Sequence, residues 1–374
     1  MANDAWLTLL HAAQQVSARP WLDALRALGS ADAVVAESAH ALLARGLSTD
    51  AVAKLKAPDA ATIERWRAWL DGPQRALVTF GSSGYPPRLA ELTDAPLALW
   101  IEGKEHSLLS APQLAIVGSR SPTTTGRETA EQFARYLSQR GLTITSGLAT
   151  GIDAASHRGS VRELGGTVAV LGNGIDIVFP RGHAQLSAEI AAHGLLVSEY
   201  APGVEPQRYF FPARNRIIAG LSYGTLVVEA TRRSGSLITA KHAMETGREV
   251  FAIPGSIHNP LARGCHWLIR QGAKLVEEAA DILVELAPQL RLEGIELSPP
   301  PAATEVAVES TYANDPAYRN LLKALDFSPL SIAELSTRAE LTTAELSSML
   351  LILELEGLVE ALPGGRYARL GKRK

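Results

Sequence analysis

The sequence predicts an α/β protein built on an extended Rossmann-like, doubly wound and mainly parallel sheet, flanked by a small N-terminal helical module and a C-terminal winged helix. Three observations predict this fold class. Between residues 114 and 253, six short apolar runs alternate with plausible helices, which indicates a parallel sheet covered on both faces. Residues 1–72 show apolar positions at helical spacing, and residues 316–370 have the outline of three helices followed by a hairpin.

The strands of the central domain follow from the apolar runs. The predicted strands are 114–117, 142–145, 167–171, 195–197, 225–228 and 249–253, with an added pair at 76–80 and 97–101. In such a sheet, ligands bind outside the carboxyl ends of the strands. We therefore assign residues 73–285 to one Rossmann-like domain and expect its site at the strand ends.

Two smaller modules are predicted at either side. Residues 1–72 read as short helices of mixed charge, like a sterile-alpha-motif or helix-hairpin-helix module, which favours a structural or interaction role. Residues 286–315 form a predicted linker, because the proline run near 299–301 cannot hold a regular element. Residues 316–374 form the third module.

The third module is a predicted winged helix. Its parts are a helix over 316–325, a second helix capped by Ser331 with Glu334 at capping-box spacing, a third that starts at Thr342 or Thr343 and ends at Gly357, and a hairpin over 358–370 that turns at Gly364-Gly365. The third helix carries glutamates and no lysine or arginine. A helix that reads the major groove needs basic side chains, so a protein contact is the better prediction for it.

Composition narrows the function classes. The chain has 374 residues, 46% hydrophobic and 20% charged, and a net charge of −3. That charge argues against a protein that coats nucleic acid through global attraction. The lone Cys265, the absence of a secretory start and the absence of a long apolar run predict a soluble cytoplasmic protein without a membrane partner.

One segment is strongly basic against this background. Between residues 208 and 248 there are seven basic and two acidic side chains, a local charge of +5, and Tyr209, Phe210 and Phe211 lie among them. Arginine forks for phosphates with flat rings for bases are typical of a single-strand nucleic-acid groove. An ordinary core helix whose arginines extend to the surface and whose aromatics pack inside fits the segment as well.

Small-residue loops follow several strands. Gly118-Ser119-Arg120 ends the first strand, Gly147 lies in the loop after the second, Arg181 follows the third, and Ser234-Gly235-Ser236 comes after Arg232. Such loops at helix N-termini expose backbone N–H groups to an anion. Because these loops converge on one sheet edge with three arginines, we expect an anion site there.

Signals for catalysis are weak. We expect Asp153 to cap a helix and His157 to make a local hydrogen bond, and the other histidines show no zinc spacing. Neither a phosphate-binding G-x-x-x-x-G-K-[ST] loop nor a G-x-G-x-x-G loop is present. The sequence thus predicts no catalytic residue, no metal and no cofactor.

Several long blocks resemble the DprA/Smf family of DNA-processing proteins. They are Gly118-Ser-Arg120, Ser146-Gly-Leu-Ala-x-Gly-Ile-Asp153, Ser198-Glu199, Phe211-Pro-x-Arg-Asn-Arg-Ile-Ile-Ala-Gly220, Ser234-Gly-Ser-Leu-Ile-Thr239 and Gly247-Arg-Glu-Val-Phe-Ala-Ile-Pro-Gly255. The resemblance implies a homodimeric, non-enzymatic protein that binds and protects single-stranded DNA and loads the RecA recombinase during natural transformation. It places the family's phosphate-contacting arginine on Arg120 and a further basic position on Arg181.

The predicted DNA site combines these signals. It consists of Gly118, Ser119, Arg120, Gly147, Arg181, Arg214, Asn215, Arg216, Arg232, Ser234, Gly235 and Ser236. A nucleotide phosphoribohydrolase is the alternative, since Gly224-Thr225 followed by Glu229 faintly resembles that family's Pro-Gly-Gly-x-Gly-Thr-x-x-Glu run. Here Leu221-Ser-Tyr223 replaces Pro-Gly-Gly and the glutamate is one position late. A winged-helix transcription regulator is a third interpretation, but the basic recognition face that such a regulator needs is missing from this sequence.

Overall fold

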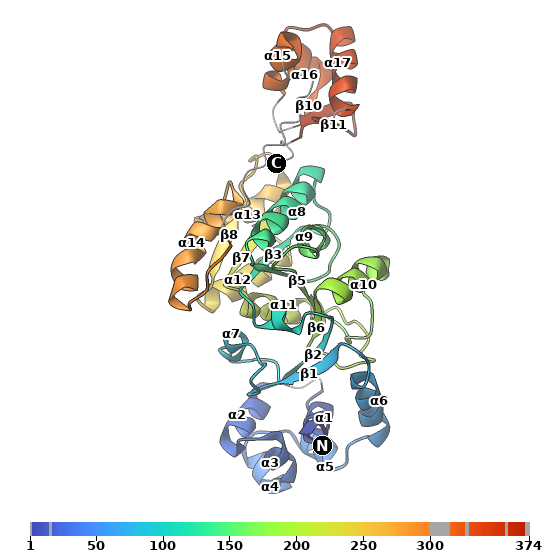
Figure 1. The fold of residues 1–374 in the computed structure, drawn as a ribbon, viewed down its shortest axis with the longest axis vertical. Coiled ribbons are helices and arrows are strands. Elements are labelled where there is room, and N and C mark those ends of the chain that lie inside the picture. Colours follow the sequence, from blue (N-terminus) through green and yellow to red (C-terminus); the bar gives the residue numbers. More distant parts are fainter. Residues whose placement is uncertain (1, 15–16, 299–314, 326–328, 356–357, 371–374) are drawn as a thin grey trace. The chain divides into compact units, whose positions relative to one another are not determined.

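A computed structural model describes residues 2–14, 17–298, 315–325, 329–355 and 358–370 (Figure 1). The chain divides into two compact units, Met1–Pro299 and Pro300–Lys374. The predicted boundaries at residues 72, 285 and 315 therefore stay a prediction, while the α/β fold class is confirmed. Within the described residues, no helix combines the length and the apolar character needed to cross a membrane.

The first unit begins with six short helices. They are α1 (Ala2–Ala12), α2 (Arg19–Leu28), α3 (Ala31–Ala36), α4 (Ala39–Ala44), α5 (Thr49–Lys56) and α6 (Ala60–Leu70). The helices are short because the sequence stops and restarts them: Gly29 ends α2 with a left-handed φ of 84°, and the Ser30 side chain accepts a hydrogen bond from the third amide of α3. Figure 1 shows these helices gathered beside β1 and β2.

A nine-stranded sheet forms the rest of the first unit. Its order is β1-β2-β6-β5-β4-β3-β7-β8-β9. The strands are β1 (Arg75–Thr79), β2 (Ala98–Glu102), β3 (Gln113–Gly118), β4 (Thr143–Ser146), β5 (Thr167–Leu171), β6 (Leu195–Ser198), β7 (Gly224–Val228), β8 (Glu249–Ala252) and β9 (Lys274–Leu275). β1 with β2 and β2 with β6 are antiparallel, and the other pairs are parallel. The predicted strands and the added pair are thus confirmed.

Helices cover both faces of this sheet. The connecting elements are α7 (Pro87–Ala90), η1 (His106–Leu109), α8 (Thr124–Gln139), α9 (Ile152–Ser160), η2 (Arg181–His183), α10 (Ala184–His193), α11 (Phe210–Leu221), α12 (Ser236–Glu245), η3 (Pro260–Ala262), α13 (Arg263–Arg270) and α14 (Ala279–Leu292). Alternate residues of β3 face opposite cores: Leu114 and Ile116 pack with α8, α9 and α14, whereas Ala115 and Val117 pack with α11, α12 and α13. This two-sided burial explains why the strands read as continuous apolar runs.

Helix α14 differs from the linker prediction. It continues to Leu292 with Pro288 inside it, and Leu286 and Leu290 are buried against the sheet. Burial of these leucines outweighs the cost of the internal proline. The proline run at 299–301 lies outside the described residues.

The second unit has the predicted winged-helix elements. They are α15 (Pro316–Ala324), β10 (Leu330–Ser331), α16 (Ile332–Ala339), α17 (Thr343–Leu355), β11 (Val359–Leu362) and β12 (Arg366–Arg369), with sheet order β10-β12-β11. Ser331 and Glu334 form the capping box, and the Thr342 hydroxyl accepts a hydrogen bond from the Glu345 amide, so Thr342 caps α17. Gly364 and Gly365 adopt left-handed φ angles at the hairpin turn. The predicted end of the third helix at Gly357 lies outside the described residues.

Candidate nucleic-acid interface

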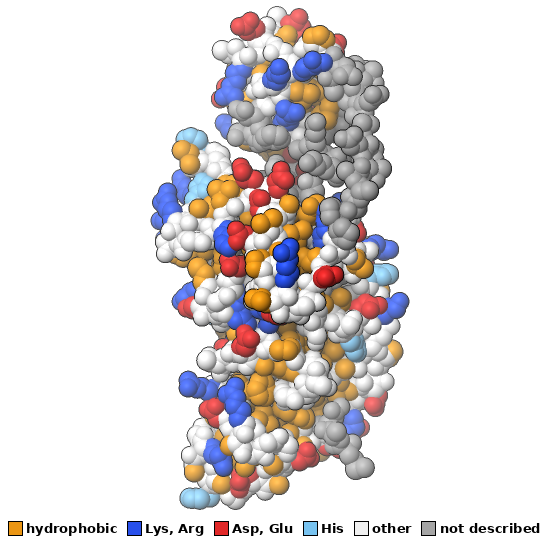
Figure 2. Space-filling view, turned by 60° about the vertical axis from the view of Figure 1, so that its left-hand side comes forward, with side chains coloured by type: hydrophobic (Ala, Val, Ile, Leu, Met, Phe, Trp, Pro, Cys, Tyr) orange, Lys and Arg blue, Asp and Glu red, His pale blue; other side chains and the backbone are white. Residues whose placement is uncertain are grey.

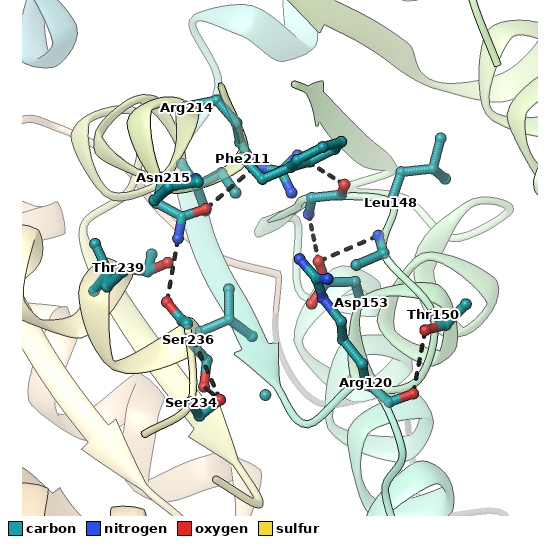
Figure 3. A pocket seen from close by; sticks show the side chains of 18 of the residues that line it. Arg120, Leu148, Thr150, Asp153, Phe211, Arg214, Asn215, Ser234, Ser236 and Thr239 are labelled. Carbon is teal, nitrogen blue, oxygen red and sulfur yellow. Dashed lines mark hydrogen bonds between the residues drawn. The ribbon is translucent and has the colours of Figure 1, made fainter. Parts of the chain in front are cut away.

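A pocket of about 840 Å³ opens at the carboxyl ends of β3, β4 and β7 (Figure 3). Nine residues of the predicted DNA site line it: Gly118, Ser119, Arg120, Gly147, Arg214, Asn215, Ser234, Gly235 and Ser236. The expectation that these loops meet at one sheet edge is confirmed, because parallel strands end together there. Arg181, Arg216 and Arg232 are not among the lining residues.

Arg120 is the exposed arginine at the end of β3. No carboxylate among the described residues pairs with its guanidinium within 4 Å. Its backbone is held in place, since the Thr150 hydroxyl donates to the Arg120 carbonyl at 3.2 Å. Gly118 before it must be glycine, because a Cβ there would lie 1.9 Å from the Val228 carbonyl oxygen. The pocket therefore has a fixed backbone that carries an exposed guanidinium, which no described carboxylate pairs with.

Arg214 is buried, with only 3% of its surface exposed. Its guanidinium donates to the carbonyl of Gly147 at 2.7 Å and to that of Val170. Burial lowers the pKa of Arg214 to about 10, and the Asp153 carboxylate opposes that shift. Arg214 thus supports the pocket wall from inside the protein, as expected if the basic segment forms an ordinary core helix. Position 147 requires glycine, because a Cβ there would lie 2.3 Å from the Arg214 guanidinium.

Three more side chains hold the loop after β4. Asp153 accepts hydrogen bonds from the amides of Gly147 and Ala149 at 3.1 and 3.4 Å. His157 accepts from the Leu148 amide at 3.3 Å, and a ring nitrogen of His183 lies 3.0 Å from the Leu148 carbonyl. These contacts fix Leu148 at a φ of 56°, a conformation that costs a branched residue energy. The loop is preorganised by side chains from α9, η2 and α11.

Asp153 and His157 both bind backbone amides of the loop after β4. Asp153 lies inside α9, whose N-cap is Gly151, so it does not cap the helix. Burial raises its pKa, while Arg214 and the two amides oppose the rise. The prediction of a local hydrogen bond for His157 is confirmed, since its other ring nitrogen lies 2.7 Å from the Thr167 hydroxyl. Burial lowers the pKa of His157 to about 3.

Arg216 lies away from the pocket. Its guanidinium pairs with both carboxylate oxygens of Glu199, at 2.6 and 3.0 Å, and with Asp94 at 3.1 Å. These carboxylates raise the pKa of Arg216 against the effect of burial. The structure therefore corrects the placement of Arg216: it links α11 to the loops before β2 and after β6. Sequence spacing could not show this, because the partners lie far away in the chain.

Arg181 and Arg232 are exposed just outside the pocket. Arg181 follows Pro180, and Arg232 follows Thr231, both of which line it. Inside the rim, the Asn215 side-chain amide donates to the Gly235 carbonyl at 3.2 Å, which ties α11 to the loop after β7. The Ser234 and Ser236 hydroxyls lie 2.7 Å apart. The predicted serine and glycine loop is thus fixed from two sides.

The aromatic side chains divide into two groups. Phe211 lines the pocket together with Phe179, which is 41% exposed, and their ring centroids lie 5.3 Å apart. Phe210 is buried and stacks on Tyr200 at 4.0 Å. Phe179 and Arg208, an exposed pocket residue, were absent from the predicted site. Phe179 could have been found from its place between a strand end and Arg181.

Basic and acidic side chains are interspersed over the face of the molecule that Figure 2 shows, as expected from the near balance of the two in the chain. Within the described ranges no group of three or more histidine, cysteine or acidic side chains could hold a metal ion. The exposed pocket arginines, Arg120 and Arg208, can bind an anion at this sheet edge.

Comparison with known proteins decides the family. Residues 76–287 match the family described as DNA recombination-mediator protein A, and residues 298–365 match the DprA winged helix domain. The chain belongs to the DprA/Smf family. The family is one of DNA-processing recombination mediators, and the matched domains confirm the winged helix.

Three relatives within the DprA/Smf family illustrate the match. Protein Smf of Escherichia coli is 45% identical over 312 residues, which are 83% of this chain and 81% of the relative. The structure of DNA processing protein A from Streptococcus pneumoniae has a TM-score of 0.67 at 37% identity, and the match covers 76% of this chain and 98% of that one. A structure that describes a single-stranded DNA binding mode of the Helicobacter pylori protein has a TM-score of 0.52 at 27% identity, with 57% and 96% covered.

Proposed function

We propose that this protein binds single-stranded DNA in the pocket at the ends of β3, β4 and β7. The observation that carries the proposal is the exposed guanidinium of Arg120 on a fixed loop, in a pocket that is also lined by the paired rings of Phe179 and Phe211. A guanidinium binds phosphate through charge-assisted hydrogen bonds, and exposed rings stack on unpaired bases. Of the predicted residues that line the pocket, we propose direct contacts for all but the buried Arg214, which supports the wall. Arg181 lies at the rim, and Arg232 lies outside the part of the strand that the pocket holds.

The biological step follows from the family. We infer that the bound strand is protected and handed to the RecA recombinase during natural transformation, in the cytoplasm, by a homodimer. The description of the family as a recombination mediator and the DNA-binding mode described for the Helicobacter pylori relative support this inference. Mixing the protein with RecA and DNA covered by a single-strand-binding protein, and following strand exchange, tests it. Exchange that is no faster with the protein than without it would refute the loading role.

We also propose that the pocket performs no catalysis. Among its described lining residues Asp153 is the one carboxylate, and its Oδ2 accepts two backbone hydrogen bonds. Glu229, the residue on which a phosphoribohydrolase would depend, accepts from the amide and the hydroxyl of Thr123 at 2.8 and 2.6 Å and lies outside the pocket lining. A carboxylate at the N-terminus of α8 serves the helix. The structure thus supports the binding function over the hydrolase.

One experiment separates these two functions. Labelled oligonucleotides are titrated with the protein, and nucleoside monophosphates are incubated with it in parallel while free base is measured. We expect saturable DNA binding and no release of base. Base release that a Glu229→Gln variant loses would establish the hydrolase instead.

A further inference from the structure

A second group of arginines lies beside the pocket, at the ends of β7 and β8. Arg232 and Arg233 follow Thr231, which lines the pocket, and Arg263 opens α13 after the loop that leaves β8. All three side chains are exposed. We call them the β7–β8 arginines.

Backbone contacts bring these distant residues together. The Ala230 amide donates to the Leu261 carbonyl at 2.6 Å, and the Gly264 amide donates to the Ala230 carbonyl at 2.7 Å. A Cβ on Gly264 would lie 2.5 Å from the Ala230 carbonyl oxygen and 2.8 Å from that of Thr231. Glycine at position 264 therefore allows the start of α13 to lie directly against the loop that carries Arg232. The arginine cluster is built by the fold.

No ion pair with a described carboxylate neutralises the cluster. None of its three guanidinium groups pairs within 4 Å with a carboxylate of the described residues, whereas Arg248 pairs with Glu91 and Lys274 with Glu249 and Glu285. The acidic residue nearest to Arg232 in sequence is Glu229, whose carboxylate accepts hydrogen bonds from the amide and the hydroxyl of Thr123. Like charges that are held together repel one another, and a polyanion relieves that repulsion.

We propose that the β7–β8 arginines bind the phosphates of the strand where it continues beyond the pocket. This inference rests on the proposed function, since it needs a strand already held by Arg120. Thr231 and Ser234 line the pocket on either side of Arg232 and Arg233, so a strand that leaves the pocket on this side meets the arginines at once. Ile257, in the neighbouring loop and 73% exposed, offers an apolar surface to an unpaired base. These features favour a single strand as the partner over an acidic protein.

The test compares binding of short and long DNA. A variant with Arg232→Ala, Arg233→Ala and Arg263→Ala is titrated with oligothymidines of increasing length at one salt concentration. The shortest oligothymidine that the wild type binds should bind the variant equally well, because it fills only the pocket. Long oligothymidines should bind the variant about tenfold more weakly than the wild type. Their plot of log K against log salt should become shallower by about 2, since each phosphate contact on a single strand contributes about 0.7.

A matched control removes the same charge elsewhere. Arg19, Arg45 and Arg65 are exposed arginines of the N-terminal helices that pair with no described carboxylate. Their triple alanine variant should bind every length like the wild type. Both variants should keep the wild-type melting temperature, because the side chains are exposed.

Different outcomes refute different claims. An equal loss for short and long DNA would overturn the proposed continuation, since the arginines would then act on the pocket itself or through net charge. Unchanged binding at every length would overturn it too, as would a loss restricted to duplex DNA. A wild-type protein that bound no oligothymidine would instead refute the proposed function.

Discussion

The two arginines nearest the centre of the pocket have different tasks. Arg120 is exposed and unpaired among the described residues, whereas Arg214 is buried and donates to two carbonyls. A preorganised guanidinium should contribute the full charge-assisted bond to phosphate, about 1.5–3 kcal/mol. We therefore predict that Arg120→Ala weakens single-strand binding at least about tenfold, at 1.4 kcal/mol per decade. Titration with a labelled oligonucleotide at fixed salt measures this.

Arg233 provides the matched comparison. It is exposed and has Arg232 beside it, so its single loss should cost roughly 0–1 kcal/mol. Arg233→Ala should therefore bind markedly better than Arg120→Ala, once both are shown to be folded. Equal or reversed losses would contradict the placement of the phosphate site on the β3 loop.

His157 makes the stability of the protein depend on pH. Burial lowers its pKa to about 3, with Arg214, His183 and Arg158 adding to the shift, while the unfolded chain has the ordinary value near 6.5. Between these values the unfolded state binds the extra proton, so stability is lost as pH falls below about 6.5, by up to roughly 1.4 kcal/mol per pH unit. Urea unfolding at several pH values measures the slope. The His157→Gln variant leaves Asp153 unchanged, and its stability should fall less steeply with pH than that of the wild type. An identical slope would contradict the assignment of this pH dependence to His157.

The loop after β4 can be tested as an element through its glycine. A Cβ at Gly147 would lie 2.3 Å from the Arg214 guanidinium, whereas a Cβ at Gly235 would meet nothing within 4 Å. Overpacking of this kind costs about 1–3 kcal/mol. Gly147→Ala should thus lower the free energy of unfolding by that amount in a urea titration and weaken DNA binding. Gly235→Ala should leave stability unchanged, and equal stability of the two variants would show that the wall of the pocket can yield.

The winged helix can be tested by removal. The exposed side chains of α17 include Ala344, Ser347, Ser348 and Leu351, together with Glu345 and Glu354, and none of them is an arginine or a lysine. The pocket lies within the first unit. Deletion of residues 316–374 should therefore leave most of the single-strand affinity, measured with the same labelled oligonucleotide. Loss of binding by the truncated protein would contradict the site.

Elements were more predictable than side-chain roles. The apolar runs of β3 to β8 predict strands because both faces of the sheet are buried, and Ser331 predicts the start of α16 because few residues cap helices well. Helix α14 extends into the predicted linker as far as Leu292, because burial of its leucines outweighs the cost of Pro288. The local sequence pattern predicts that an element forms, whereas burial in the folded protein determines where the element ends.

For the whole molecule, the sequence predicted the sheet edge at which the pocket lies, but it could not separate buried arginines from exposed ones. Nothing in the sequence around Arg120, Arg214 and Arg216 shows which of these side chains is buried and which is exposed. The partners of the two α11 arginines are the Gly147 and Val170 carbonyls and the Asp94 and Glu199 carboxylates, which only the fold brings near. The basic segment therefore contains both kinds of arginine: α11 contributes the core arginines that one interpretation predicts, and the loops around it carry exposed ones. The nucleic-acid groove stays a prediction.

Strand preference tests the whole molecule. The Phe179 and Phe211 rings can stack only on bases that are unpaired, and the exposed side chains of α17 include no arginine or lysine for a duplex backbone. We therefore predict tighter binding of single-stranded than of duplex DNA of the same length and sequence. Filter binding at matched salt measures this preference. Affinity should fall steeply as salt rises, because arginines that bind phosphates release counterions from the DNA.

Replacing Phe211 with leucine should narrow the preference for single strands without changing the salt slope, since it removes a ring and no charge. Equal affinity for both forms in the wild type would mean that phosphates alone are recognised, and the pocket would then be an anion site without base stacking.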